Sequence, residues 1–306
     1  MSQAPVSVEG GNRAIGKWWI MRRLSQLGIL GLFLLGPLGG VWVVSGNLNS
    51  SLTLKTLPLT DPLYLLQMLA AGQMPYRTAW IGAAIVLAFY LLLGGRMFCG
   101  WVCPMNIVTD TAAWLRAKLR IKGGVRIPRK LRLWILGGML ALTAITGTLA
   151  WELVNPVSML HRGLIFGMGW GWLIILAIFL FDVFGSQRAW CGHLCPVGAF
   201  YGLLGKASPV HVSAEKRAAC NDCMDCFAVC PEPQVITPPL RGEAKGVGPL
   251  INDVDCSKCG RYIDASGKIT YLELEPIRKN LLTRIRNGLG KVIEMTYGST
   301  VLEMAR

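Results

Sequence analysis

The stretch that decides how this chain is organised is Cys220-Asn-Asp-Cys223-Met-Asp-Cys226-Phe-Ala-Val-Cys230-Pro231, a C-x2-C-x2-C-x3-C-P run. Three thiolates at this spacing can wrap one corner of a cubane cluster, and the fourth ligates the other cluster in two-cluster ferredoxins. Zinc sites normally pair two separated C-x2-C knuckles, and cysteines this close together are awkward to bridge as disulfides. The run therefore predicts an iron–sulfur site.

A second cysteine run begins at Cys256-Ser-Lys-Cys259, but its third and fourth positions hold Tyr262 and Ser266. In a two-cluster arrangement, the two ligand sets are Cys220, Cys223, Cys226 and Ser266, and Cys230, Cys256, Cys259 and Tyr262. Each set then lacks one thiolate. One cluster with a substituted ligand, one cluster with rearranged thiols, and two labile sites all remain open.

The composition of the whole chain is that of a membrane protein. Of 306 residues, 53% are hydrophobic and only 16% are charged, with a mean hydropathy of +0.45. Uncharged runs cover 27–45, 78–95, 133–151 and 163–181, each close to the roughly 20 residues that a membrane helix needs. We therefore expect a mainly α, polytopic membrane protein of four transmembrane helices, arranged as two repeated hairpins and followed by a small cytoplasmic ferredoxin-like α+β module.

The net charge of +14 follows from this topology and does not call for nucleic acid. The loop 96–132 holds nine Lys and Arg residues against one Asp, whereas 46–77 holds two basic residues and 152–162 holds one. The positive-inside rule then places both termini in the cytoplasm and the two loops poor in basic residues in the periplasm or its equivalent. An export signal at Arg22-Arg23 is the alternative, although the apolar run after it is long and no cleavage site follows.

Four segments follow from these patterns. They are a basic cytoplasmic N-terminus (1–26), a four-helix membrane domain (27–204), a ferredoxin-type iron–sulfur module (205–275) and a basic amphipathic tail (276–306). The module has little apolar material, so a cluster must hold it together. The tail is typical of a helix that lies on an anionic membrane surface or packs against the module.

An internal repeat relates the two halves of the predicted membrane domain. The sequence Phe98-Cys99-Gly-Trp-Val-Cys103-Pro104 recurs 92 residues later as Trp190-Cys191-Gly-His-Leu-Cys195-Pro196. Upstream, Asp61-Pro62 recurs as Asn155-Pro156, and an Asp or Asn followed by Pro is a start signal for a helix. The two copies share one orientation, so an axis along the membrane normal relates them.

The four repeat cysteines, Cys99, Cys103, Cys191 and Cys195, are candidate redox thiols. They could hold a cluster or a soft metal where the copies meet, or alternate between thiol and disulfide. The prolines that follow Cys103 and Cys195 would leave backbone groups free near the sulfurs. Packing of small buried side chains is the alternative.

Gln67 and His161 occupy equivalent positions in the two copies and are the predicted catalytic residues. Their side chains could bond the hydroxyls of a quinol, and His161 could accept a proton. Tyr64 and Ser158 are paired in the same way, and polar anchoring of loops is the alternative for all four. No histidine falls inside a predicted span, which excludes a bis-histidine haem there. If the protein handles electrons, iron and sulfur must carry them.

The duplicated motifs, the four predicted helices and the ferredoxin module together resemble the NapH family, the membrane-bound ferredoxin-type quinol dehydrogenase component of periplasmic nitrate reductase systems. The likeness covers residues 20–270. It implies a protein of the bacterial inner membrane that passes electrons from the membrane quinol pool, with a periplasmic polyferredoxin partner (NapG), towards the nitrate reductase. It also implies that the [4Fe-4S] ligands are Cys220, Cys223, Cys226, Cys230, Cys256 and Cys259, and that the repeat cysteines are the family's paired membrane-proximal thiols. Tyr262 and Ser266 depart from the family's second run.

We expect an electron-transfer subunit that oxidises quinol and passes electrons singly through one or two [4Fe-4S] clusters. An alternative is a membrane factor that reduces or delivers copper during assembly of a respiratory enzyme, because soft thiolates suit Cu(I). A passive anchor for a soluble polyferredoxin is the third interpretation.

Overall fold

A computed structural model describes residues 16–271 of the chain. Its gaps are 55, 122, 126, 168, 215–216, 218–219, 221–223, 243–245, 252 and 262–269. Three predicted cluster positions, Cys223, Tyr262 and Ser266, and the tail 276–306 therefore lie outside the described residues.

The described chain is mainly helical. The helices are α1 (Lys17–Gly39), α2 (Pro62–Ala70), α3 (Arg77–Leu93), α4 (Met105–Lys118), α5 (Leu131–Thr146), α6 (Pro156–Phe166), α7 (Gly171–Leu180), α8 (Pro196–Gly205), α9 (Asp225–Val229) and α10 (Thr237–Arg241). Between them lie the π-helical turns η1 (Phe98–Val102), η3 (Phe181–Gly185) and η4 (Trp190–Leu194), and the 3-10 turns η2 (Ala150–Leu153) and η6 (Pro233–Val235).

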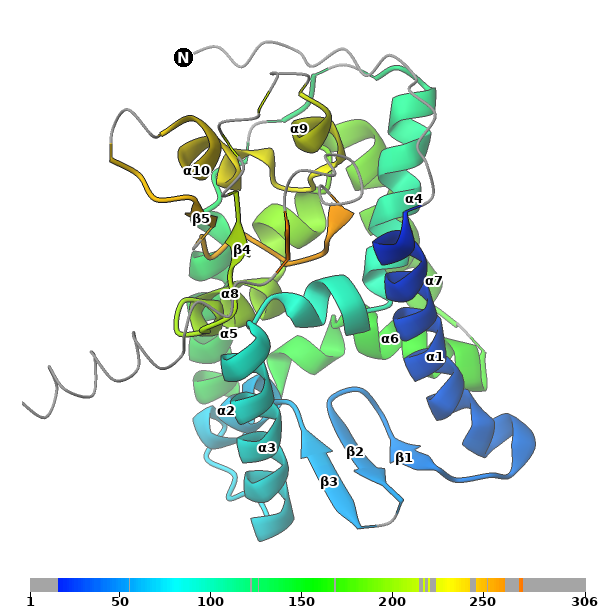
Figure 1. The fold of residues 1–306 in the computed structure, drawn as a ribbon. Coiled ribbons are helices and arrows are strands. Elements are labelled where there is room, and N and C mark those ends of the chain that lie inside the picture. Colours follow the sequence, from blue (N-terminus) through cyan, green and yellow to red (C-terminus); the bar gives the residue numbers. More distant parts are fainter. Residues whose placement is uncertain are drawn as a thin grey trace, which may run out of the picture.

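Two small antiparallel sheets complete the described fold. One has the order β1-β2-β3, built from β1 (Val44–Gly46), β2 (Ser50–Thr53) and β3 (Leu57–Thr60). The other has the order β5-β4-β6, built from β4 (Val212–Ser213), β5 (Leu250–Ile251) and β6 (Thr270–Tyr271). Figure 1 shows the first sheet at one end of the molecule and the segment that carries α9 and α10 at the opposite end.

The repeat predicts two helix starts, and both are confirmed. The Asp61 side chain accepts a hydrogen bond from Leu63 N at 2.9 Å at the start of α2. At the start of α6, the Asn155 side chain accepts one from Val157 N at 3.1 Å. In both helices proline stands at the first position, where its missing N–H costs nothing.

The expectation of four transmembrane helices is wrong. Among the described residues, no helix combines the length and the apolar character that crossing a membrane requires. Helix α3 has 17 residues, α5 has 16 and α7 has 10, against the roughly 20 of a typical span. Helix α1 has 23 residues, but Lys17, Arg22 and Arg23 lie within it. The location of the chain in the cell stays a prediction.

Glycines end the predicted spans early. The run 27–45 stops being helical at Gly40, whose φ is 71°, and α5 stops at Gly147, whose φ is 66°. Within the run 163–181, Gly167 with φ 85° separates α6 from α7. Glycine adopts positive φ without strain, and a residue in this conformation ends a helix. An uncharged run shows that a segment is apolar, but it does not show where a glycine ends the helix.

One apolar core joins the two copies of the repeat. It contains Phe98 and Cys103 from the first copy and Val197 and Tyr201 from the second, packed with side chains of α2, α3 and α5. The rings of Phe98 and Tyr201 stack with their centroids 5.1 Å apart. The two cysteine motifs are therefore held against each other by buried contacts.

A smaller core supports the C-terminal cysteines. Val212, Ile236 and Ile251 are buried around Cys226 and Cys256. This core lies in the segment after α8, which Figure 1 shows above α8 at the α9–α10 end of the molecule.

Candidate iron–sulfur sites

The two C-x3-C-P copies adopt the same backbone conformation. In each, a π-helical turn closes with a bond from the second cysteine back five residues, Cys103 N to Phe98 O and Cys195 N to Trp190 O, both at 2.9 Å. The second cysteine is extended, with φ and ψ of −65° and 119° at Cys103 and −70° and 114° at Cys195. The proline then starts a new helix, α4 or α8. π-helical turns of this kind are frequent at functional sites.

Backbone amides at the start of the following helix bond to each second sulfur. Met105 and Asn106 contribute them to Cys103, and Val197 and Gly198 contribute them to Cys195. These N–H groups belong to the first helical turn, where no intrahelical acceptor exists. Each proline therefore frees amides that stabilise negative charge on sulfur, as the sequence predicts.

The four repeat thiols lie together in the core. Burial raises the pKa of the Cys103 thiol, and Cys99 and Cys195 raise it further. Burial and the other three repeat thiols likewise raise the pKa of Cys191, and burial with Cys99 brings that of Cys195 to about 12. Such mutual repulsion disfavours four free thiolates in this site, and bound iron would offset it.

This donor set fits a [4Fe-4S] cluster. Cubane clusters are held by four cysteine thiolates and are tuned by hydrogen bonds to the sulfurs. No group of three or more Cys, His, Asp or Glu side chains in the described chain is arranged tightly enough for a single metal ion.

A second set of thiols forms where the two C-terminal runs meet. Cys230 lies close enough to Cys259 and Cys256 that, after burial, these two raise its pKa most. Burial also raises the pKa of Cys256, to about 11. The ferredoxin rule groups the same three residues. Cys226 is buried beside Cys256 in the smaller core, whereas Cys220 is exposed.

Glycines let the second set approach the first. A Cβ on Gly100 would lie 3.2 Å from Ser257 O and 3.5 Å from Cys259 Cβ. In the other copy, a Cβ on Gly192 would lie 2.7 Å from Glu232 Oε1, two residues after Cys230. Both motif glycines therefore mark places where the C-terminal runs rest directly on the repeat.

Hydrogen bonds fasten the Cys256–Cys259 segment to this surface. Trp101 Nε1 donates to Lys258 O at 3.1 Å. Arg96 donates to Asp255 O at 2.6 Å and to Cys191 O at 3.1 Å, so one side chain joins both repeat copies to the segment. The Lys258 ammonium is buried against Ser208 Oγ at 3.0 Å, and burial lowers its pKa to about 8.

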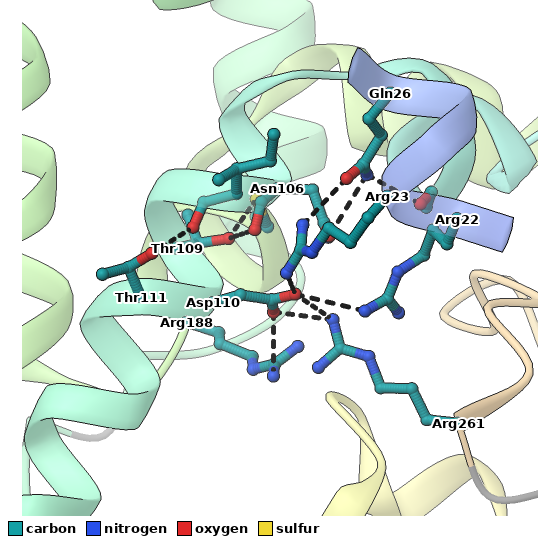
Figure 2. A network of polar contacts seen from close by, with 12 residues as sticks. Arg22, Arg23, Gln26, Asn106, Thr109, Asp110, Thr111, Arg188 and Arg261 are labelled. Carbon is teal, nitrogen blue, oxygen red and sulfur yellow. Dashed lines mark hydrogen bonds and ion pairs between the residues drawn. The ribbon is translucent and has the colours of Figure 1, made fainter. Parts of the chain in front are cut away.

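One side of the second set faces a group of arginines around a single carboxylate, which we call the Asp110 cluster (Figure 2). The shortest ion-pair distances to the Asp110 carboxylate are 3.4 Å for Arg22, 2.5 Å for Arg23, 3.1 Å for Arg188 and 2.6 Å for Arg261. Burial acts against ionisation, but the arginines hold the pKa of Asp110 well below its usual value.

The other side faces the Asp255 cluster, in which arginines meet two carboxylates. Arg129 binds Asp255 at 2.9 Å and Glu232 at 3.1 Å, Arg96 lies 3.9 Å from Asp255, and Arg132 pairs with it as well. The two clusters thus differ in balance, because the Asp255 cluster has one more acid and one fewer base.

The arginines of both charge clusters act to lower the pKa values of nearby thiols, and they outweigh burial at Cys259. Burial acts to raise the pKa of Cys259, but Arg261 and Arg22 hold it below its usual value. At Cys99, burial raises the pKa although Arg96 and Arg132 of the Asp255 cluster act to lower it. Among the described cysteines whose pKa is shifted, Cys259 is therefore the thiol whose anionic form the protein favours most.

At the other end of the repeat core lies a small pocket. Its lining includes Asn49, Asp61, Leu63, Tyr64, Gln67, Phe98, Trp151, Glu152, Asn155, Val157 and Val197. Its volume is about 10 Å³, the size that one water molecule requires. The wall towards the repeat motifs is formed by Phe98, next to Cys99, and Val197, two residues after Cys195.

Acidic and amide groups meet in this pocket. Gln67 is 1% exposed, and its Oε1 has no hydrogen-bond partner among the described residues. Burial raises the pKa of Asp61 to about 6, although Leu63 N and the Tyr201 hydroxyl donate to its carboxylate. Glu152 accepts from Asn49 at 2.6 Å and from Asn155 at 3.1 Å.

The structure does not bring the two predicted catalytic residues into one pocket. Gln67 lines it, but His161 does not. His161 is buried with its ring 5.0 Å from that of Phe33, edge to face, and burial lowers its pKa. Tyr64 lines the pocket, and Ser158 bonds Glu152 at 3.1 Å beside it. The roles of Gln67 and His161 stay predictions.

Sequence reasoning missed the charged residues around the sulfurs. Arg96 and Arg188 each precede the first cysteine of a motif by three positions, so the repeat did carry this signal. Asp255 directly precedes Cys256, which is also visible in the sequence. No local pattern marks Asp110, because its arginine partners are as far as 151 positions away.

Comparisons with known proteins agree with this geometry. A family model, Fer4_5, described as a 4Fe-4S binding domain, matches residues 77–122 and 165–214. These segments contain the two C-x3-C-P copies and not the C-terminal cysteine runs. No solved structure matches the chain.

Several curated proteins are similar over most of the chain. The methylamine utilization ferredoxin-type protein MauN of Methylorubrum extorquens is 55% identical over 226 residues, which cover 74% of this chain and 79% of that protein. The ferredoxin-type protein NapH of Escherichia coli is 49% identical over 255 residues, covering 83% and 88%. The NapH of Haemophilus influenzae is 48% identical over 278 residues, covering 89% and 96%.

Proposed function

This chain belongs to the family of ferredoxin-type proteins that includes NapH and MauN, and we propose that it oxidises a quinol and passes the electrons through its two sulfur sites to an iron–sulfur partner. The family and its 4Fe-4S domain make it an iron–sulfur electron-transfer protein. That the electron donor is a quinol is the part that we propose beyond this. When bound, the clusters would supply one-electron acceptors, which a two-electron donor needs.

One observation carries the proposal. The pocket shares its inner wall, Phe98 and Val197, with the core that buries the repeat thiols. A molecule in that pocket would therefore be separated from the first sulfur site by a single layer of side chains. The pocket is small in this state, so a quinol ring would need Tyr64 or other lining side chains to move.

The pocket offers acceptors for both parts of a quinol oxidation. Loss of two electrons from a quinol releases two protons, and the electrons would go one at a time towards Cys99 and Cys195. The Gln67 carbonyl, which lacks a partner in the described chain, would accept a bond from a quinol hydroxyl. The Asp61 carboxylate, with a pKa of about 6, would accept one proton at neutral pH. The Glu152 carboxylate, which lines the same pocket, would accept the other.

Electrons would pass from the repeat site to a second centre, and the contacts at Gly100 and Gly192 between the two sites support this step. Cys230, Cys256 and Cys259 would hold the second centre together with ligands outside the described residues. The partner is proposed from the resemblance to the NapH family, as a polyferredoxin that serves a periplasmic nitrate reductase. A MauN is similar to this protein as well, and its name refers to methylamine utilization. The identity of the final electron acceptor therefore also has to be tested.

The experiment is a reductive titration of the anaerobically purified full-length chain. Iron and acid-labile sulfide are counted first, and a water-soluble quinol is then added while EPR follows the reduced centres. We expect iron in the protein and reduction by the quinol. Gln67→Leu should slow reduction without loss of iron, whereas His161→Leu, the matched change outside the pocket, should leave the rate close to wild type. Iron centres that stay oxidised with excess quinol but reduce with dithionite would overturn the quinol donor.

A further inference from the structure

The Asp110 cluster holds more positive charge than its structural role requires. Four guanidinium groups share one carboxylate, and among the described residues none of them forms an ion pair with any other carboxylate, although Asp182 acts on Arg188 from farther away. The side chains involved are 1% to 15% exposed. A surplus of this size in a buried place is costly, because burial weakens the hydration of each charge.

Several donors in the cluster are also unsatisfied. Nε and Nη1 of Arg22, Nε of Arg188 and Nε of Arg261 are buried without a hydrogen-bond acceptor in the described chain. Natural proteins rarely leave such groups unpaired. Both the charge and the free N–H groups therefore indicate a missing anion close by.

The Asp110 cluster lies beside one particular sulfur. Arg261 follows Cys259 by two residues, and Arg261 Nη2 donates to both oxygens of the Asp110 carboxylate at 2.6 Å. Arg22 reaches the site from α1. On the same helix, Gln26 donates to Gly100 O at 2.9 Å, and the Cα of Gly100 faces Cys259. Figure 2 shows these arginines converging from separate elements on Asp110.

We propose that the Asp110 cluster is the counter-charge of the iron–sulfur centre at Cys230, Cys256 and Cys259, and that its surplus of arginines raises the reduction potential of that centre. Reduction adds one electron and thus one negative charge, which nearby cations stabilise. The inference rests on the proposed function because it assumes that the iron–sulfur centre is present. It does not depend on which molecule donates the electrons.

Opposite charge changes test this. Arg22→Gln removes one cation and keeps two donors, whereas Asp110→Asn removes the one anion and leaves the four cations. At the wild-type midpoint potential, Arg22→Gln should lower the ratio of reduced to oxidised centre about tenfold, a shift of about 59 mV for one electron. Asp110→Asn should raise the ratio. The readout is a dithionite-based redox titration followed by EPR, which needs no quinol.

Arg162→Gln on α6, an exposed arginine outside the cluster, is the matched control and should leave the midpoint unchanged. Unchanged midpoints in iron-loaded Arg22→Gln, or downward shifts in both cluster variants, would overturn the proposal. If Arg22→Gln loses iron, Arg23→Gln carries the same expectation and decides. Iron-free wild-type protein would overturn both the proposed function and this inference, whereas loaded protein that ignores quinol would remove only the donor.

Discussion

The two copies of the repeat are nearly identical at one end and different at the other. Around Cys103 and Cys195 the turn, the extended cysteine and the amides from the next helix correspond residue by residue. At the far end, Asp61 corresponds to Asn155 and Gln67 to His161, and Gln67 alone of the latter pair lines the pocket. The pocket is nevertheless built from both copies, because Asn155 and Val157 of the second copy line it as well. The repeat therefore presents matching groups at the sulfur end and unlike groups at the pocket end, a carboxylic acid against an amide and an amide against an imidazole.

The largest expected effect tests the equivalent end. Cys103→Ala and Cys195→Ala each remove one of four thiolates from a buried cluster, and both should lose most of the iron and sulfide of the repeat site. Iron analysis and EPR on anaerobic protein measure this. Equal losses would support one shared site, whereas full iron in either variant would show that the two copies do not hold a cluster together.

The second effect tests the far end. Asp61→Asn removes one of the two proposed proton acceptors from the pocket, so quinol oxidation should fall by about 100-fold. In the wild type, the pKa of Asp61 is raised to about 6, so its carboxylate form dominates above that pH. The wild-type rate should therefore drop as the pH falls through about 6, and the residual Asp61→Asn rate should lack this drop. Stopped-flow kinetics across pH 5 to 8 would show it. An Asp61→Asn variant with the wild-type pH profile would contradict the assignment.

A third, intermediate effect concerns the motif glycines. Gly100→Ala would place its Cβ 3.2 Å from a backbone atom, Ser257 O. Gly192→Ala would place its Cβ 2.7 Å from Glu232 Oε1, and this buried carboxylate is held by Arg129 at 3.1 Å. Overpacking costs about 1–3 kcal/mol where neighbours cannot move. Thermal unfolding should therefore show a lower midpoint for both variants than for the wild type, with the larger drop for Gly192→Ala. A wild-type midpoint in Gly192→Ala would mean that the C-terminal segment does not rest on the second copy as described.

The smallest effect tunes the pocket. Tyr201→Phe removes one hydrogen bond to the Asp61 carboxylate at 3.0 Å, an interaction of about 1 kcal/mol. Because that bond lowers the pKa of Asp61, its loss should raise the pKa and move the pH dependence of the rate upwards by less than one unit, about the size that 1 kcal/mol allows. The same stopped-flow series measures the shift, and a downward movement would contradict it.

The repeat and the cysteine spacing predicted what depends on local pattern. The capped starts at Asp61 and Asn155 are properties of a few adjacent residues, and the grouping of Cys230 with Cys256 and Cys259 follows from a spacing rule. The helix ends at Gly40 and Gly147 could have been predicted from these glycines. The prediction of membrane spans gave more weight to the uncharged runs. Features that depend on a few adjacent residues can therefore be predicted from the sequence.

Contacts across the chain escaped prediction for the opposite reason. Arg22 meets Asp110 across 88 positions, and Arg261 meets it across 151. A charge in a single sequence reads the same whether it is solvated or buried against such a partner. The pocket had the same difficulty, because its lining comes from the loop before β2, from α2, α6 and α8 with the caps of α2 and α6, and from η1 and η2. Only the fold shows that His161 does not line it.

The Asp110 cluster also joins distant parts of the chain. Its members lie between positions 22 and 261, so it can close only once nearly the whole described chain has been made. The entropy of closing such a long loop opposes these contacts. A chain cut before residue 261 would lack the Arg261 pair and leave Asp110 with the three remaining arginines.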